Sequence, residues 1–417
     1  MNILVSAYAC EPDKGSEPGV GWNWVMQASR FHDVWVLTRS NNRPAIERAL
    51  QRTPRRNVRW VYVDLPPLLR WWKRGSRGIH LYYYLWQIAA YFAARRLDRH
   101  VGFDVVHHVT FVSYWKPTLL PLLGKPMVWG PVGGGESAPR SFLRTMTMRG
   151  RCFEHLRNAA RAVGERDPFV RGAARHARAV LVTTNETGDR VSALGATDVR
   201  VLSQVALCEA DIARLADVEV RHEGPFRIVS VGRLVEWKGF HLALDAFAEM
   251  RKQLPSSEYW LIGDGPARPR LEDTVRRLRL DTSVRFLGSV PRATTFARLA
   301  ECDVLVHPSL HESGGWVCAE AMAAGRPVIC LALGGPALHV TPDIGYAVAA
   351  TSPGAATADM ASAMLVLARD PLLRARMGSS ARRTVAESCT WMARGDVMAE
   401  LYDRVAVRSV DRVPARA

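Results

Sequence analysis

Two glutamates with seven residues between them flank a small polar turn in "HESGGWVCAEAMAAGRPVI", residues 311–329. Glu312 stands in the turn, and Glu320 lies about one and a half turns into the helix expected after Ser313-Gly314-Gly315. The unpaired N–H groups at a helix start attract anions, and glycines let a phosphate or a sugar approach the backbone closely. The two carboxylates can therefore contact different parts of one ligand. The alternative for Glu320 is that it only complements the helix dipole.

A second loop, "VGRLVEWKGF" at residues 231–240, carries Arg233 and Lys238. Lysine occurs at only six positions, so fifty of the 56 basic residues are arginines. A lysine in such a composition suggests a position where a compact ammonium group is wanted. Two cations in one loop can hold a diphosphate, because each charge-assisted hydrogen bond contributes roughly 1.5–3 kcal/mol. Two solvated surface cations are the alternative.

Apolar runs of strand length alternate with helical stretches and would position these loops. In the first half they lie at residues 3–9, 34–39, 58–65, 104–110, 126–132 and 179–184. The rhythm restarts after a less patterned stretch, at residues 226–233, 258–266, 284–290, 303–309, 327–331 and 345–348. Because the runs are nearly continuously apolar, both faces of each sheet should be covered by helices.

The pattern predicts an α/β protein with two facing, doubly wound parallel sheets. We expect a first domain at residues 1–204, a second at 205–389, and a C-terminal helix at 390–417 that crosses back to the first domain. In such sheets ligands bind beyond the carboxyl ends of the strands, so the loops after the strands should carry the chemistry.

Three weaker signals lie in the first half. Gly19 and Gly21 of "GSEPGVGWNW" form a glycine-rich turn, although close packing of a helix on a strand also needs such glycines. His107 and His108 end a strand, where one of two neighbouring residues normally packs inward. Glu136 follows the glycine run of "GPVGGGE".

Composition and charge argue against several classes of function. The formal charge is +16, but no helix-turn-helix, zinc-finger or RNA-binding signature accompanies it. The seven cysteines form no C-x-x-C pair, which argues against a disulfide framework or a zinc site. No compact set of Asp, Glu and His surrounds Glu312, so we expect no metal. The N-terminus enters an apolar strand without a basic leader, so we expect a cytoplasmic protein.

These motifs together resemble glycosyltransferase family 4, the retaining nucleotide-sugar transferases of GT-B fold. The resemblance rests on the two spaced glutamates before "AMAAGRPVI", on "GRLVEWKG" and on "IGDGP". It covers essentially the whole chain, with the N-terminal half more divergent. It implies two Rossmann-like domains with the donor cleft between them.

The resemblance also implies a role for each matching residue. Arg233 and Lys238 would hold the donor diphosphate, and Glu320 the ribose hydroxyls. Glu312, with the backbone of residues 313–315, would hold the transferred sugar.

Other matching positions are assigned by the same resemblance. Leu287 and Gly288 would lie near the nucleobase. Gly19 and Gly21 would belong to a loop that closes over the donor phosphates.

The chain departs from the family pattern at one place. Many members carry a histidine near the reacting sugar after the strand "PMVW", where this chain reads "GPVGGGE". His107, His108 and Glu136 are the alternatives for contact with the acceptor.

The resemblance implies a retaining, metal-independent transferase of the hexosyltransferase type. The departing phosphate itself would take the acceptor proton. No cofactor is expected beyond the nucleoside diphosphate sugar, which is a co-substrate. Bacterial polysaccharide, glycolipid or other glycoconjugate synthesis is the expected setting. A nucleotide-sugar epimerase of GT-B fold and a non-enzymatic, basic nucleic-acid-binding protein remain the alternatives.

The segment "PPLLRWWKRGSRG" suggests the kind of acceptor. Trp71, Trp72, Lys73 and Arg74 lie in a loop before a tyrosine-rich helix expected at about 80–97. The acceptor is expected to be a sugar or a lipid-linked sugar. Tryptophans beside cations suit an anionic membrane surface, so they favour the lipid-linked sugar and peripheral association with the inner face of a membrane. The helix is too short to span a bilayer of about 30 Å, and packing on the first sheet is its alternative role.

Overall fold

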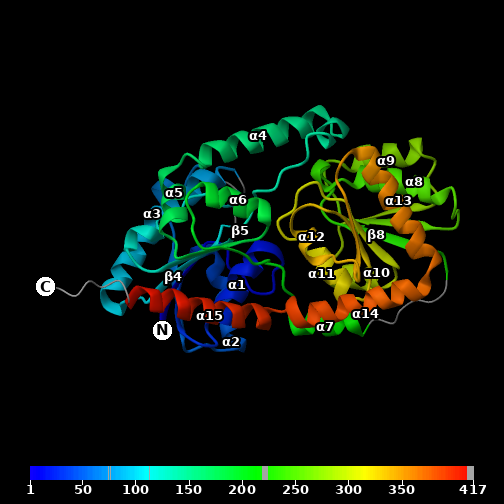
Figure 1. Ribbon diagram of the computed structural model, residues 1–417. Coiled ribbons are helices and arrows are strands. Elements are labelled where there is room, and N and C mark those ends of the chain that lie inside the picture. The colour runs from blue at the N-terminus through cyan, green and yellow to red at the C-terminus, as the bar shows by residue number, and fades with distance from the viewer. Residues whose placement is uncertain (74, 76, 112, 218–223, 411–417) are drawn as a thin grey trace. The chain divides into compact units, whose positions relative to one another are not determined.

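The computed structural model describes residues 1–73, 75, 77–111, 113–217 and 224–410. This part of the chain divides into two compact units, each built on one parallel sheet (Figure 1). The first unit contains Met1–Gly135, Ala159–Gln204 and the described residues from Trp391 onward. The second contains Glu136–Asn158 and Val205–Thr390.

The sheet of the first unit has seven strands within the described residues, in the order β3-β2-β1-β4-β5-β6-β7. The strands are β1 (Asn2–Ala7), β2 (Asp33–Arg39), β3 (Val58–Val63), β4 (Val105–Thr110), β5 (Met127–Val132), β6 (Ala179–Val182) and β7 (Val199–Val201). Every residue of β4, β5 and β6 is buried, as expected for strands covered on both faces. The short strand β7 was not predicted, because its three partly exposed residues give no apolar run.

Helices lie on both faces of this sheet. They are α1 (Ser16–Ala28), α2 (Arg43–Arg52), α3 (Ile79–Val101), α5 (Pro168–His176), α6 (Asn185–Ala193) and α15 (Trp391–Val410), with 3₁₀ turns η1 (Ser40–Asn42), η2 (Pro67–Leu69) and η3 (Leu120–Leu123). Trp86 of α3 and Trp129 of β5 belong to one core cluster. On α1 and α15, Trp24 packs edge-on against Trp391, with ring centroids 5.8 Å apart.

The sheet of the second unit has six strands within the described residues, in the order β10-β9-β8-β11-β12-β13. The strands are β8 (Arg227–Val231), β9 (Glu258–Ile262), β10 (Val284–Gly288), β11 (Val304–His307), β12 (Val328–Leu331) and β13 (Gly345–Val348). The two parallel sheets confirm the predicted α/β class and the restart of the strand pattern.

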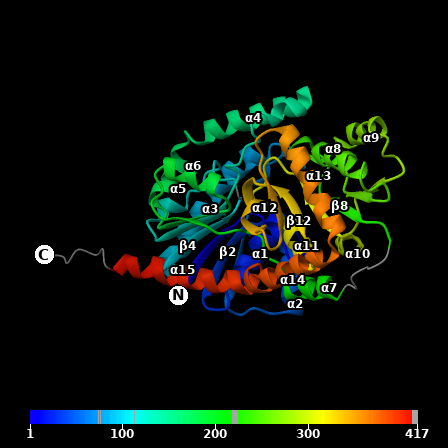
Figure 2. The same cartoon turned by 45° about the vertical axis from the view of Figure 1, so that its right-hand side comes forward.

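The helices of the second unit also form two layers (Figures 1 and 2). One core cluster includes residues of α8 (Phe240–Arg251), α9 (Arg268–Arg277) and α13 (Pro353–Arg369). The other includes residues of α7 (Glu209–Ala216), α10 (Arg292–Ala300), α11 (Trp316–Ala323) and α14 (Pro371–Ser388). The remaining elements are α12 (Gly334–His339), η4 (Phe142–Thr145) and η5 (Glu236–Lys238).

Helix α4 (Met148–Gly164) begins in the second unit and ends in the first. Residues 136–158 were expected in the first domain, because they follow β5 in the chain. They group with the second unit instead. The physical reason is side-chain contact, since Glu154 of this segment pairs with His311 at 2.9 Å and Phe153 stacks on Trp237.

His107 ties α15 to the first sheet. Its Nδ1 lies 2.6 Å from the hydroxyl of Tyr402, and its Nε2 lies 2.6 Å from the carbonyl oxygen of Gly130. Burial lowers the pKa of His107 to about 4, and burial together with the neighbouring His107 lowers the pKa of His108 to about 3. Both imidazoles are therefore neutral in the folded protein at neutral pH.

We predict that the free energy of unfolding falls as the pH is lowered from about 6.5 toward 4. In that range the unfolded chain takes up protons on these histidines, whose ordinary pKa is about 6.5, while the folded chain does not. Each histidine contributes a loss of up to about 1.4 kcal/mol per pH unit. Urea unfolding as a function of pH measures the slope. His107→Gln should reduce it and replacement of the exposed His155 by Gln should not, so equal slopes in all three proteins would contradict the prediction.

Candidate active site

Two loops at the carboxyl edge of the second sheet are joined along their length. The loop after β8 contains η5, and the loop after β11 leads to α11. The backbone N–H of Leu310 donates to the carbonyl of Trp237 at 2.8 Å. Gly239 has φ +67°, and a Cβ there would lie 2.0 Å from the carbonyl oxygen of Pro308. Glycine is therefore required for the two loops to approach this closely.

Lys238 and Glu312 meet in an ion pair across these two loops. Their side chains are only 17% and 22% exposed, so both charges are largely removed from water. Ser309 Oγ lies 3.4 Å and His307 Nε2 lies 3.6 Å from the same carboxylate oxygen. Burial alone would raise the pKa of Glu312, but the charge of Lys238 and the contact with His307 outweigh it and hold this pKa well below its usual range. Glu312 is therefore an anion.

Arg233, the other predicted cation of this loop, is exposed. Its guanidinium group has no ion-pair or hydrogen-bond partner among the residues that the structure describes. Unlike Lys238, it can bind an anion without giving up a contact.

Glu320 of α11 is paired with an arginine that the sequence analysis did not select. Arg292 Nη2 lies 2.9 Å from its carboxylate, and Arg292 Nη1 lies 2.6 Å from Asp211. Burial raises the pKa of Glu320, although Arg292 opposes the change. Arg292 could not be selected from the sequence because it is one of fifty arginines and follows a different strand.

The Ser313-Gly314-Gly315 turn leads into α11 as predicted, and Gly315 has φ +87°. Ser313 Oγ donates to Glu136 at 2.8 Å. Glu136 was a candidate for acceptor contact, but its side chain is 2% exposed and lies in this loop network. The glycine pair of "ALGGPA" after β12 was missed by the sequence analysis. Gly335 donates to the carbonyl of Glu312 at 2.8 Å, and a Cβ at Gly335 would lie 2.5 Å from the carbonyl oxygen of Ser313.

The residue before Glu312 takes part in an aromatic stack. His311 stacks on Trp237, with ring centroids 5.6 Å apart and planes at 14°. Trp237 in turn stacks on Phe153, at 4.9 Å and 10°. His311 Nε2 also pairs with Glu154, which is 1% exposed. Because Trp237 precedes Lys238 and His311 precedes Glu312, the stacked pair stands beside the ion pair and sets the spacing of the two loops.

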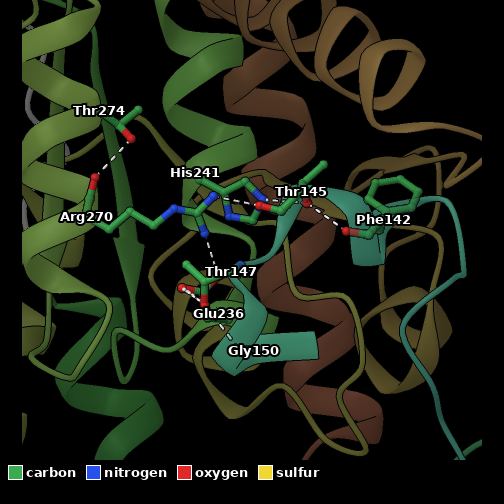
Figure 3. Close-up of polar contacts among 8 residues, drawn as sticks. All are labelled: Phe142, Thr145, Thr147, Gly150, Glu236, His241, Arg270 and Thr274. Carbon is green, nitrogen blue, oxygen red and sulfur yellow. Dashed lines mark hydrogen bonds and ion pairs between the residues drawn. The ribbon is translucent and has the colours of Figure 1, made fainter. Parts of the chain in front are cut away.

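A further network fixes η5 at its first residue (Figure 3). Arg270 of α9 donates to Glu236 at 2.5 Å and to the carbonyl of Thr145 at 2.6 Å. The hydroxyl of Thr145 contacts the Nε2 of His241 at 2.9 Å, and Thr147 contacts Glu236. These contacts hold Glu236 in place, and Lys238 follows two residues later in the same 3₁₀ turn.

The remaining predicted positions in the second unit lie at the end of β10. Leu287 is partly buried, and Gly288 has φ +70°. The carbonyl of Gly288 accepts from Gly263 N–H at 2.8 Å, which joins the ends of β10 and β9. Both therefore lie at the same edge of the sheet as the two loops.

The glycines and histidines predicted in the first unit have structural roles. Gly19 and Gly21 were expected in a loop, but α1 begins at Ser16, so both lie inside the helix. A Cβ at Gly19 would lie 1.9 Å from the carbonyl oxygen of Lys14, so the helix needs glycine to pack this closely. His107 and His108 are 0% and 1% exposed, so neither presents a side chain at the surface of its unit.

The described residues contain no group of three or more His, Cys, Asp and Glu side chains placed to hold a metal ion. No helix in the described part of the chain is both long and apolar enough to cross a bilayer.

Comparison with known proteins identifies relatives of part of the chain. The model of the family "Glycosyl transferases group 1" matches residues 211–384. The chain is 29% identical over 196 residues to a glycogen synthase of Mycobacterium tuberculosis, a match that covers 46% of this chain and 45% of the relative. It is 32% identical over 179 residues to the lipopolysaccharide core biosynthesis glycosyltransferase LpsD of Rhizobium meliloti, covering 43% and 50%. The chain thus spans about half the length of these curated relatives.

Solved structures match over nearly the whole chain. Anabaena HepE in complex with UDP covers 97% of this chain and 99% of its own, with a TM-score of 0.61 and 17% identity. The sucrose-phosphate synthase of Thermosynechococcus elongatus covers 98% and 99%, with a TM-score of 0.65 and 20% identity. At these identities the likeness shows the fold, which is the GT-B fold of two parallel-sheet α/β domains.

We predict that Lys238 and Glu312 are energetically coupled. Lys238→Met leaves a partly buried carboxylate unpaired and should lower the free energy of unfolding by about 2 kcal/mol. Adding Glu312→Gln should recover at least about 1 kcal/mol of that loss, because the uncompensated charge is removed. Urea unfolding of the two single variants and the double variant measures the coupling. The exposed pair of Lys252 and Glu249 serves as the control, and its double-mutant cycle should give a value near zero. Strictly additive effects of Lys238→Met and Glu312→Gln would refute the coupling.

Proposed function

We propose that this chain, whose residues 211–384 match the model of the glycosyl transferases group 1 family, moves a sugar from a nucleoside diphosphate sugar to an acceptor hydroxyl. The observation that carries the proposal is the convergence of Arg233, Lys238 and Glu312 on two joined loops at the carboxyl edge of the second sheet. An exposed guanidinium beside a sheltered ammonium–carboxylate pair suits a ligand with an anionic and a polyhydroxyl part.

In this proposal each residue has one role toward the donor. Arg233 and Lys238 bind the diphosphate, and Lys238 then shares its charge between the phosphate and Glu312. Glu312 and the backbone of residues 313–315 hold the transferred sugar. Glu320 binds the ribose, which requires Arg292 to yield part of its contact. Leu287 and Gly288 lie near the nucleobase, an assignment supported by their position at the same sheet edge.

The chemistry follows from the charges. As the bond to the sugar breaks, negative charge develops on the leaving diphosphate, where Arg233, Lys238 and the start of α11 stabilise it. We propose that no metal ion is required, because these groups supply the counter-charge. We also propose retention of the anomeric configuration, with the departing phosphate taking the acceptor proton. The burial of His107 and His108 supports the transfer of this proton to the phosphate, because neither histidine is placed as an accessible base.

The acceptor is proposed from the first unit and from the relatives. LpsD is named for lipopolysaccharide core biosynthesis, and another relative, from Corynebacterium glutamicum, is named a mannosyltransferase of a phosphatidylinositol monomannoside. In this chain Trp71 and Leu68 are 78% and 84% exposed, next to Lys73. Trp72 is partly buried against the core of the first unit, and Arg74 lies outside the described residues. We propose a lipid-linked sugar acceptor in glycoconjugate synthesis at the inner face of a membrane.

A panel of nucleotide sugars in the presence of EDTA tests the reaction. UDP-sugars should be tried first, because the structural relative HepE was solved with UDP. Release of nucleoside diphosphate supports a transferase with slow hydrolysis. An epimerised sugar would instead indicate an epimerase. Salt-sensitive binding of DNA or RNA without any effect of nucleotide would indicate a nucleic-acid-binding protein.

We predict that Arg233→Ala and Lys238→Ala each weaken the binding of the preferred nucleoside diphosphate by about tenfold or more, because each removes a charge-assisted hydrogen bond. Calorimetric titration measures the affinity, and thermal unfolding with and without ligand identifies the base. Lys252→Ala, at an exposed lysine outside the two loops, is the control. Unchanged affinity in both loop variants would rule out their role.

We predict different kinetic effects for the two glutamates. Glu312→Gln should lower kcat at least about tenfold with a smaller change in the Michaelis constant of the donor, because Glu312 is placed beside the reacting sugar. Glu320→Gln should mainly raise that Michaelis constant, because ribose contacts are made equally in the ground and transition states. Steady-state kinetics with varied donor separate the two, and identical profiles would contradict the division.

A further inference from the structure

The exposed side of α4 is apolar. Met148, Leu156 and Val163 are 74%, 65% and 71% exposed, and Cys152 is also exposed. In chain order these residues are Met148, Cys152, Leu156 and Val163. Their spacings of four, four and seven residues place them on one side of the helix. Phe153, 45% exposed, borders this stripe.

Three charged side chains of α4 contact the protein instead. Glu154 pairs with His311 at 2.9 Å. Arg157 donates to the carbonyl of Glu136 at 2.8 Å, and Arg161 donates to the carbonyl of Gly135 at 3.0 Å. An ordinary surface helix turns its apolar stripe to the core and its charges to water. In α4 the apolar stripe is exposed and three charged side chains are turned inward, so burial in the core of this chain does not account for the stripe.

The charges around the stripe are positive. Glu154 is the one acidic residue of α4 and is buried, whereas Arg149 is exposed and Arg151 is partly so. Arg144 precedes the helix and is exposed, and the exposed Arg166 follows it. The neighbouring acidic residues are engaged elsewhere, since Glu165 pairs with Arg190 and Asp167 caps α5. An apolar stripe flanked by cations is the pattern of helices that lie in the interface of an anionic membrane. Pairing with a second copy would bring these like charges together.

We infer that α4 is an interfacial helix that docks on an anionic lipid surface. Its seventeen residues form a rod of about 25 Å that would lie in the plane of the membrane, with Met148, Leu156 and Val163 among the acyl chains. The inference deepens the proposed function, and rests on it for a lipid-linked acceptor. It adds a docking surface distinct from the loop at Trp71.

Docking through α4 has a consequence for the site. Glu154 holds His311, and Arg157 holds the backbone of Glu136, whose carboxylate accepts from Ser313. The inward side of the same helix therefore contacts the loop of Glu312. Lipid binding on the outer side fixes this loop near the membrane surface, where a lipid-linked acceptor would be presented.

Vesicle binding of the full chain tests the inference. Wild-type protein should co-sediment with vesicles of phosphatidylglycerol and phosphatidylcholine, and not with phosphatidylcholine alone. Leu156→Ser with Val163→Ser should weaken this binding at least about tenfold, because two apolar side chains no longer leave water. Leu372→Ser with Val407→Ser is the matched control, since those residues are 72% and 62% exposed on other helices. Nucleoside diphosphate binding should be equal in all these proteins.

A fluorescence experiment reports on the stripe directly. Cys152 and Cys208 are the exposed cysteines of the described chain, so an environment-sensitive dye can be placed at Cys152 in Cys208→Ser and at Cys208 in Cys152→Ser. Emission should shift to the blue with anionic vesicles only for the dye at Cys152.

Several outcomes would overturn the inference. The inference fails if wild-type protein stays in the supernatant with anionic vesicles at low salt. Equal binding by the α4 variant would show that the overall charge alone attracts the protein. If Leu68→Ser with Trp71→Ser releases the protein and the α4 variant does not, membrane association holds through the loop and α4 has no part in it. Dimerisation without lipid that is lost in the α4 variant would assign the stripe to a second copy. Loss of nucleotide turnover with vesicle binding intact would count against the proposed reaction alone.

Discussion

The ion pair of Lys238 and Glu312 is the constraint on which the site depends. Each charge is sheltered from water and is tolerable there only because the other is present. The pair forms only if the loops after β8 and β11 lie within reach, which the glycine at 239 and the stack of Trp237 on His311 make possible. The electrostatics of the site therefore depend on the packing of these two loops.

Residues 136–158 contact the two loops and help to hold them in place. They follow β5 of the first sheet in the chain, yet Glu136 accepts from Ser313 and Glu154 pairs with His311. Thr147 contacts Glu236 in the same way. Three segments far apart in sequence thus hold one cluster of side chains. The inward charges that do this leave the apolar residues of α4 on the outside.

Several arginines stabilise the fold by donating hydrogen bonds to carbonyl groups at helix ends. Arg326 donates to the carbonyl of Ala300 at the end of α10, and Arg382 to that of Ala324 after α11. Arg374 donates to Ala368 near the end of α13. The guanidinium groups complement the negative ends of three helices around a cavity of about 650 Å³. Part of the surplus positive charge is therefore balanced by backbone carbonyls.

The sequence by itself determined the α/β class, both sheets and the loops that carry Arg233, Lys238 and Glu312, because buried parallel strands are continuous apolar runs and their loops follow in order. It did not reveal Arg292 or Glu154, which act on residues far along the chain, and it placed Glu136 and residues 136–158 with the wrong unit. It also predicted a loop at the glycines at 19 and 21, although both lie inside α1 and let the helix pack closely against the backbone of Lys14 and Ala9. Only the tertiary structure decided these points. Local patterns encode which residues enter a strand, a helix or a turn, whereas contact between distant side chains depends on how the whole chain packs.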